Sequence, residues 1–123
     1  MSLLRKLVGS RRTEPGPVVA KALAAAESVR AIPEIGGDQS KNRELVGIIE
    51  SLKAAQLGLE TGKDREGIPI SPLELSERLS RTLGYMKQRG IWARLTAKAG
   101  RDTKAQLHRL EKDIAEAARA LKG

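Results

Sequence analysis

The sequence predicts an all-α domain, a small bundle of four principal helices whose third member is kinked near Gly90. Apolar residues recur every three or four positions in four segments, and glycine and proline separate those segments. No strand pattern of comparable strength occurs, and the 123 residues include one Trp, one Tyr and no Phe. A chain of this length buries enough surface for one aliphatic core. We therefore expect a single helical domain over residues 15–123.

The first helix is expected to run from Pro17 to about Ala31. Proline suits the first helical turn, and Pro33 prevents the helix from continuing. Its apolar face includes Ala22 and Ala26, whose small side chains permit close packing against another helix. Residues 32–39 are expected to form a loop.

The second helix is expected to begin at about Ser40 or Asn42 and to end at Thr61, with Gly62 as its C-terminal cap. Its apolar residues follow a helical period and form one continuous face. These residues are Leu45, Ile48, Ile49, Leu52, Ala55 and Leu59.

The third helix has a clear start at Ser71. The Ser71 hydroxyl can accept from the Glu74 amide while the Glu74 carboxylate accepts from the Ser71 amide, and Ile70 with Leu75 completes a hydrophobic staple. Pro72 fits the first turn. The buried stripe of this helix is expected to contain Leu75, Leu79, Leu83 and Met86.

A kink or break is expected near Gly90. In an unbroken helix Ile91 and Leu95 would lie about 160° and 200° from Leu75, away from the buried stripe. We therefore expect a short separate helix that includes Ile91, Leu95 and Ala99 and ends at Gly100.

The last helix is expected to run from Asp102, as its N-cap, to Leu121. Its apolar residues alternate at three and four positions, a spacing that a seam between two helices would bury. The seam packs either inside the domain or against a partner or a second copy. The residues expected at such an interface are Leu107, Leu110, Ile114 and Leu121.

Residues 1–14 are expected to form a flexible or peripheral N-terminal segment. Leu3, Leu4, Leu7 and Val8 share one helical face beside basic residues. That face could rest on an anionic membrane or a partner, or the terminus could fray or dock on its own domain. No signal peptide or membrane span is expected, and the absence of cysteine fits a reducing compartment, so we expect a cytoplasmic protein.

The formal charge of +8 is concentrated in one part of the chain. Residues 1–77 contain 11 basic and 11 acidic side chains, and residues 113–123 contain two of each. Residues 78–112 contain ten basic and two acidic side chains and so account for the whole excess. A concentrated positive field attracts polyanions, which makes this segment the candidate binding region.

Arg78, Arg81, Tyr85 and Arg89 form a strip about 80° wide on the third predicted helix, away from its apolar stripe. Guanidinium groups pair with phosphate oxygens, and an aromatic ring stacks on an exposed base. Trp92 either extends this platform or anchors the core. The alternative interpretation of the strip is a solvated helix face that keeps a small protein in solution.

We expect a non-enzymatic basic accessory protein that binds nucleic acid, DNA or RNA, electrostatically and with little base-specific readout. The alternatives are a helical adaptor or structural subunit of an oligomer or heteromer, and a protein that binds an anionic membrane surface through residues 1–12. The residues expected to contact nucleic acid are Arg78, Arg81, Tyr85, Lys87, Arg89, Arg94, Lys98, Arg101 and Lys104.

Catalytic, cofactor and metal sites are not expected. His108 is the only histidine and lies off the apolar seam, so no catalytic triad or zinc site is indicated. Glu60, Asp64 and Glu66 alternate with basic residues, and their spacing is not that of a calcium-binding loop.

Overall fold

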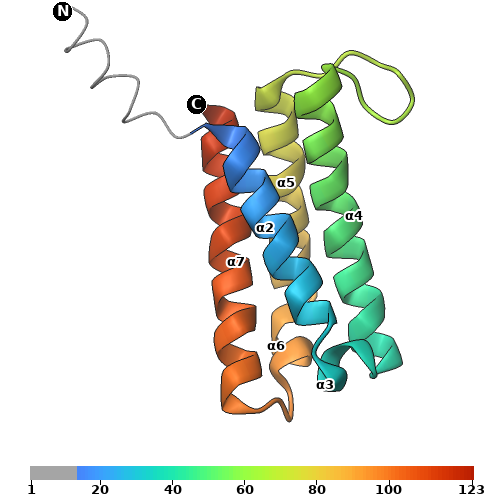
Figure 1. Ribbon diagram of the computed structural model, residues 1–123, viewed down its shortest axis with the longest axis vertical. Coiled ribbons are helices and arrows are strands. Elements are labelled where there is room, and N and C mark those ends of the chain that lie inside the picture. Colours follow the sequence, from blue (N-terminus) through green and yellow to red (C-terminus); the bar gives the residue numbers. More distant parts are fainter. Residues whose placement is uncertain (1–13) are drawn as a thin grey trace, which may run out of the picture.

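The computed structural model describes residues 14–123, and every regular element in that range is a helix (Figure 1). Within this range there is no strand, only an isolated antiparallel bridge between Lys63 and Pro69. The predicted all-α class is confirmed. The expected apolar face of residues 1–13 lies outside the described residues. The helices are α2 (Pro15–Arg30), α3 (Pro33–Gly36), α4 (Gln39–Thr61), α5 (Pro72–Gln88), α6 (Ile91–Thr96) and α7 (Arg101–Lys122).

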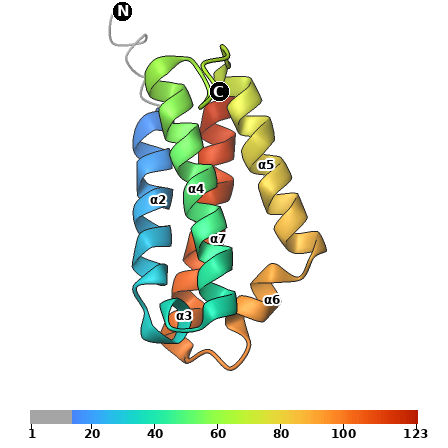
Figure 2. The same cartoon turned by 90° about the vertical axis from the view of Figure 1, so that its right-hand side faces the viewer.

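The four long helices run alternately in opposite directions, and each packs against two others (Figures 1 and 2). Helix α2 lies against α4 and α7, and α5 lies against the same two helices from another side. The core fills the space between them and is almost entirely aliphatic. Its fully buried large side chains are Val19, Val29, Ile35, Leu45, Leu52, Leu95, Leu107, Leu110 and Ile114.

The first half of the chain contains more helix than expected. Helix α2 begins at Pro15 rather than Pro17, because proline also fits the first position of a helix, where no amide partner is lost. The expected loop contains the one-turn helix α3, held in place by the fully buried Ile35. Helix α4 begins at Gln39, since the Asp38 carboxylate accepts from the Lys41 amide at 3.0 Å.

Helix α5 begins as expected, with a complete capping box. The Glu74 amide donates to Ser71 Oγ at 3.2 Å, and the Ser71 amide donates to Glu74 Oε1 at 3.1 Å. Ile70 and Leu75, the predicted staple, are both buried. Leu83, expected in the buried stripe, is only partly buried.

Between α5 and α6, Gly90 has a φ of 67°, a left-handed conformation that glycine adopts readily. Helix α6 ends at Thr96, earlier than expected, and Lys98 in the following turn has a φ of 61°. Trp92 packs partly buried against the core, and its Nε1 is buried without a hydrogen-bond partner among residues 14–123. Trp92 therefore serves the core more than the surface.

The start of α7 depends on a residue far away in the sequence. Helix α7 begins at Arg101, so Asp102 lies in its first turn and is not the expected N-cap. The Gly100 amide instead donates to Glu34 Oε1 at 3.2 Å. The Thr103 hydroxyl and the Gly100 amide hold the pKa of Glu34 below its usual value, because both bonds favour the charged carboxylate.

The expected seam of the last helix packs inside the domain. All four of its residues face the other helices of the same chain and are 0–2% exposed. Their burial agrees with the first of the two arrangements expected for the seam, and it leaves no exposed apolar surface at these residues for the alternative, an interface with a partner or a second copy, in this structure. The residues are Leu107, Leu110, Ile114 and Leu121.

Candidate nucleic-acid interface

All nine residues expected to contact nucleic acid are exposed. Arg78, Arg81, Tyr85 and Lys87 lie on α5, and Arg89 follows its last residue. The other four come from later elements: Arg94 on α6, Lys98 in the turn after it, and Arg101 and Lys104 at the start of α7.

Two of the ten basic residues in segment 78–112 are paired with acidic ones. Arg78 lies 3.9 Å from the Asp64 carboxylate, and Arg94 lies 2.8 Å from the Glu44 carboxylate. Arg94 also donates to the carbonyl oxygen of Arg89 at 2.8 Å. The remaining eight make no ion pair within residues 14–123: Arg81, Lys87, Arg89, Lys98, Arg101, Lys104, Arg109 and Lys112.

Tyr85 is the exposed aromatic residue of the strip, with 54% of its surface accessible. The Arg89 guanidinium carbon lies 5.5 Å from the centre of the Tyr85 ring, within the range of a cation–π contact. The contact steadies both side chains while leaving part of the ring exposed. Tyr85 and Arg89 therefore form a small platform near the end of α5.

A groove separates much of α4 from α5. The two helices approach closely near Gly58, where an added Cβ would lie 2.8 Å from a methyl carbon of Leu75. Farther along, α5 diverges from α4 and α6 returns toward the start of α4 (Figure 2). At Gly47 of α4 an added Cβ would meet nothing within 4 Å. The groove contains two hollows that share Ser51 and Thr82.

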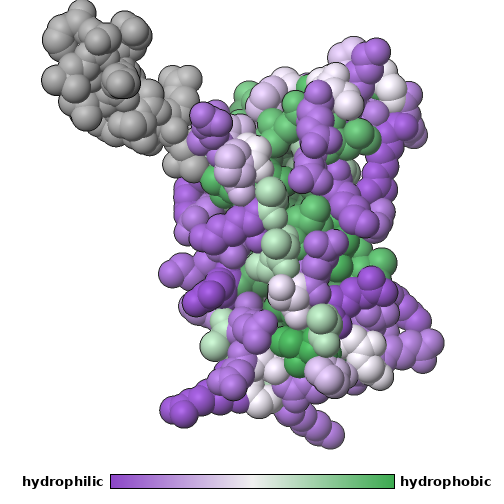
Figure 3. All heavy atoms as spheres, viewed as in Figure 1, coloured by the Kyte–Doolittle hydropathy of each residue, from purple (hydrophilic) through white to green (hydrophobic). Residues whose placement is uncertain are grey.

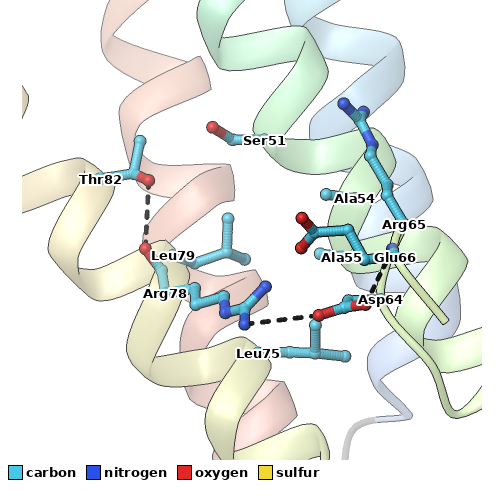
Figure 4. Close-up of a pocket in the computed structure, with 10 residues that line it drawn as sticks. All are labelled: Ser51, Ala54, Ala55, Asp64, Arg65, Glu66, Leu75, Arg78, Leu79 and Thr82. Atoms are coloured by element: carbon cyan, nitrogen blue, oxygen red, sulfur yellow. Dashed lines mark hydrogen bonds and ion pairs between the residues drawn. The ribbon is translucent and has the colours of Figure 1, made fainter. Parts of the chain in front are cut away.

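The first hollow lies beside the connection between α4 and α5, and we call it the loop-side hollow (Figure 4). Its volume is about 480 Å³, and Leu75 and Leu79 form part of its apolar wall. Arg78 and Asp64 face each other across it. Its lining residues are Ser51, Ala54, Ala55, Asp64, Arg65, Glu66, Leu75, Arg78, Leu79 and Thr82.

The second hollow lies toward α6, and we call it the α6-side hollow. Its volume is about 360 Å³. Arg81 and Tyr85 of the predicted strip border it from α5, and Glu44 borders it from α4. Its lining residues are Glu44, Gly47, Ile48, Ser51, Arg81, Thr82, Tyr85, Met86 and Ile91.

The basic residues of α7 do not all lie with those of α5. Arg109 and Lys112 line a different depression beside α2, together with Lys21, Asp113 and other polar residues. There Lys21 Nζ lies 3.8 Å from the buried Asp113 carboxylate. Hydrophilic side chains flank a band of hydrophobic ones on the face seen in Figure 3. The basic residues between Arg78 and Lys112 are thus divided over at least two faces.

Sequence reasoning missed the residues that α4 and the α4–α5 connection contribute. Glu44, Gly47 and Ser51 complete the α6-side hollow, and Asp64 and Glu66 complete the loop-side hollow. The helical period of α4 placed Ile48 on an apolar face but gave no sign that α5 diverges next to it.

Among residues 14–123, no cluster of three or more histidine, cysteine or acidic side chains is placed to hold a metal ion. In the same range, no helix has both the length and the apolar character needed to cross a membrane.

Comparisons with known proteins found no family model, no curated protein and no solved structure that matches the chain. The chemistry of the exposed residues therefore carries the functional argument. The relevant features are cations that make no ion pair within the described part of the chain, the exposed ring of Tyr85 and an open groove beside them.

Proposed function

We propose that this protein is a non-enzymatic nucleic-acid-binding protein that uses the exposed cations of α5, α6 and the start of α7. Its scaffold is a four-helix bundle, with the third long helix bent at Gly90 so that α6 returns toward the core. Binding is mainly electrostatic, because lysine and arginine neutralise phosphates and release counterions. The cysteine-free composition supports a cytoplasmic location.

The observation that carries the proposal is the excess of unpaired positive charge. Eight of the ten basic residues in segment 78–112 have no acidic partner within the described part of the chain, and six of these, all but Arg109 and Lys112, lie outside the depression beside α2. Exposed cations that are not neutralised within the protein keep their full attraction for phosphate. The proposal centres on Arg81, Tyr85 and Arg89, where charge and an exposed ring occur together.

Two apolar faces that an adaptor could offer to a protein partner are buried inside the domain. The alanine-rich face of α2 is buried at Ala22 and Ala26, and the seam of α7 is buried at Leu107 and Leu110. The membrane alternative depends on residues 1–12, outside the described residues. The exposed cations of segment 78–112 favour a polyanionic ligand.

A salt titration tests the proposal. Fluorescence anisotropy of labelled single- and double-stranded DNA and RNA is measured across a range of salt concentrations. If about four to six phosphates are contacted, log K falls with log salt with a slope of roughly −4 to −5. No binding at about 50 mM salt, or binding that does not depend on salt, would contradict the proposal.

A pair of variants separates local charge from total charge. Arg81→Ala with Arg89→Ala removes two unpaired cations of the strip. We expect the salt slope to become shallower by about two and affinity to fall about tenfold or more, because each phosphate contact contributes about one unit of slope. Arg43→Ala with Lys53→Ala removes the same charge from exposed positions of α4 and is the matched control. Equal losses in both pairs would mean that only net charge matters.

A further inference from the structure

The α6-side hollow offers a flat aromatic surface at its edge. Tyr85 lines the hollow, and the nearby Arg89 guanidinium packs over its ring at 5.5 Å. Aromatic side chains held in this way stack on single-stranded bases, whose faces are accessible when they are not paired. A paired base inside a duplex cannot present its face to Tyr85 without leaving the stack.

The walls of the hollow suit an aromatic ring. Ile48, Met86 and Ile91 supply apolar contacts. On α4, Gly47 carries no side chain, and the space where its Cβ would lie is empty to 4 Å. The volume of about 360 Å³ falls within the range of small-molecule sites, about 300–1,000 Å³.

Polar groups in the hollow match the edge of a base. Glu44 provides a carboxylate. Arg94 Nη2 donates a hydrogen bond to Glu44 Oε2 at 2.8 Å and so holds the carboxylate in place. Ser51 provides a hydroxyl that can both donate and accept. Unpaired bases are recognised through hydrogen bonds of this kind to their exposed edges.

Cations lie on both sides of Tyr85 along α5. Arg81 lines the hollow one turn earlier, and Arg89 lies one turn later. Neither makes an ion pair within residues 14–123. A strand that follows α5 would therefore place its phosphates near the two arginines and one base at Tyr85.

We propose that the α6-side hollow binds one unpaired base of a single-stranded nucleic acid, stacked on Tyr85, with the neighbouring phosphates at Arg81 and Arg89. This inference rests on the proposed nucleic-acid-binding function and narrows it to single strands. The stacked base adds an interaction that a duplex, read only through its phosphates, does not make.

Three labelled probes of equal length test the inference by anisotropy. They are an oligodeoxythymidine about 12 nucleotides long, a range that small single-strand sites cover, an abasic strand with the same phosphates, and a DNA duplex. We expect the thymidine strand to bind about tenfold more tightly than the abasic strand at the same salt concentration, since stacking contributes to the first alone.

Gly47→Leu is the decisive variant. Leucine is a better helix former than glycine, so α4 is expected to keep its stability while the new side chain occupies the hollow. We expect the thymidine strand to lose about tenfold in affinity while the abasic strand and the duplex are unaffected. Gly84→Leu, in α5 and also in open space but outside the hollow, is the matched control and should not change binding.

The outcomes distinguish this inference from the broader function. Equal affinity for the thymidine and abasic strands, or an unchanged affinity of Gly47→Leu for the thymidine strand, would overturn the base site. Salt-dependent binding of the same probes would still support the broader nucleic-acid-binding function. If none of the three probes binds at low salt, and single- and double-stranded RNA do not bind either, both proposals fail. Loss of all three probes in Gly47→Leu, with an unchanged circular dichroism spectrum, would also contradict a site that acts on the base alone.

Discussion

The two sides of the molecule are packed differently. Along α2 and α7 the helices touch over most of their length through buried residues such as Val19, Ala22 and Leu110. Between α4 and α5 the close approach at Gly58 gives way to two hollows, and the contact between the helices is much less extensive. The α2–α7 side is therefore the more closely packed of the two.

The same substitution on the two sides should have different costs. Leu110→Ala removes a fully buried side chain from the closed side and is expected to lower the free energy of unfolding by about 3–5 kcal/mol. Leu79→Ala should cost about 2–3 kcal/mol, because Leu79 borders the loop-side hollow and its loss enlarges an open space rather than creating a closed cavity. Urea unfolding followed by circular dichroism measures both. Equal losses would mean that the hollow is closed in solution.

The loss of oligonucleotide affinity on removing two cations should also differ between the two sides. Arg109→Ala with Lys112→Ala takes two positive charges from the depression beside α2, where Asp113 and Glu116 already lie close by. We expect at most a threefold loss of oligonucleotide affinity, well below the effect of removing two cations from the α5 strip, since long-range charge acts weakly across screened solvent. Anisotropy at about 100 mM salt, where the Debye length is about 10 Å, makes the comparison. A larger loss here would place the interface at the depression beside α2 instead of along α5.

Helix α4 contains one glycine at a closely packed position, Gly58, and one at an open position, Gly47. Gly58→Ala should lower the free energy of unfolding by about 1 kcal/mol, because overcrowding against Leu75 outweighs the gain in helix propensity. Gly47→Ala should raise it by about 0.5–1 kcal/mol, since nothing obstructs the added methyl group. Thermal unfolding of both variants gives the signs. A stabilised Gly58→Ala would show that α5 moves aside at little cost.

Glu34 should give the smallest effect, visible as a pH dependence. Its folded pKa is lowered, so its contribution to stability is full above its ordinary pKa of 4.5 and is lost as pH falls through the lower folded value. Glu34→Gln should therefore flatten the acid limb of stability, measured by urea unfolding at several pH values below 5. Glu77→Gln removes an exposed carboxylate of α5 that makes no ion pair within residues 14–123 and is the matched control.

Local signals in the sequence were sufficient for much of the fold. Ser71 and Glu74 are three residues apart, so their capping box could be predicted without knowledge of the rest of the chain. The start of α7 could not be, because its capping carboxylate belongs to Glu34, 66 residues before Gly100. Long-range pairing of this kind leaves no periodic trace in the sequence.

The candidate site likewise has a part that local sequence signals predicted and a part that depends on long-range packing. Helical geometry alone predicted that Arg81, Tyr85 and Arg89 share one side of their helix, and the contact between Tyr85 and Arg89 agrees with this. Which neighbour that side faces depends on how α5 packs, so the sequence did not reveal the hollow beside it. Gly47 and Gly58 are both glycines within the same predicted helix, and the sequence does not distinguish them. In the structure Gly47 lies in open space, whereas Gly58 lies against Leu75 of α5.

The position of Trp92 gives the protein a built-in optical reporter. It is the only tryptophan in the chain, so all indole emission comes from one place. Trp92 is the next residue in the chain after Ile91, which lines the α6-side hollow. The buried Nε1 of Trp92 forms no hydrogen bond within the described residues. The emission maximum of an indole moves to longer wavelength when water reaches the ring. Any movement of α6 that admits solvent would therefore shift the fluorescence emission maximum of the unlabelled protein.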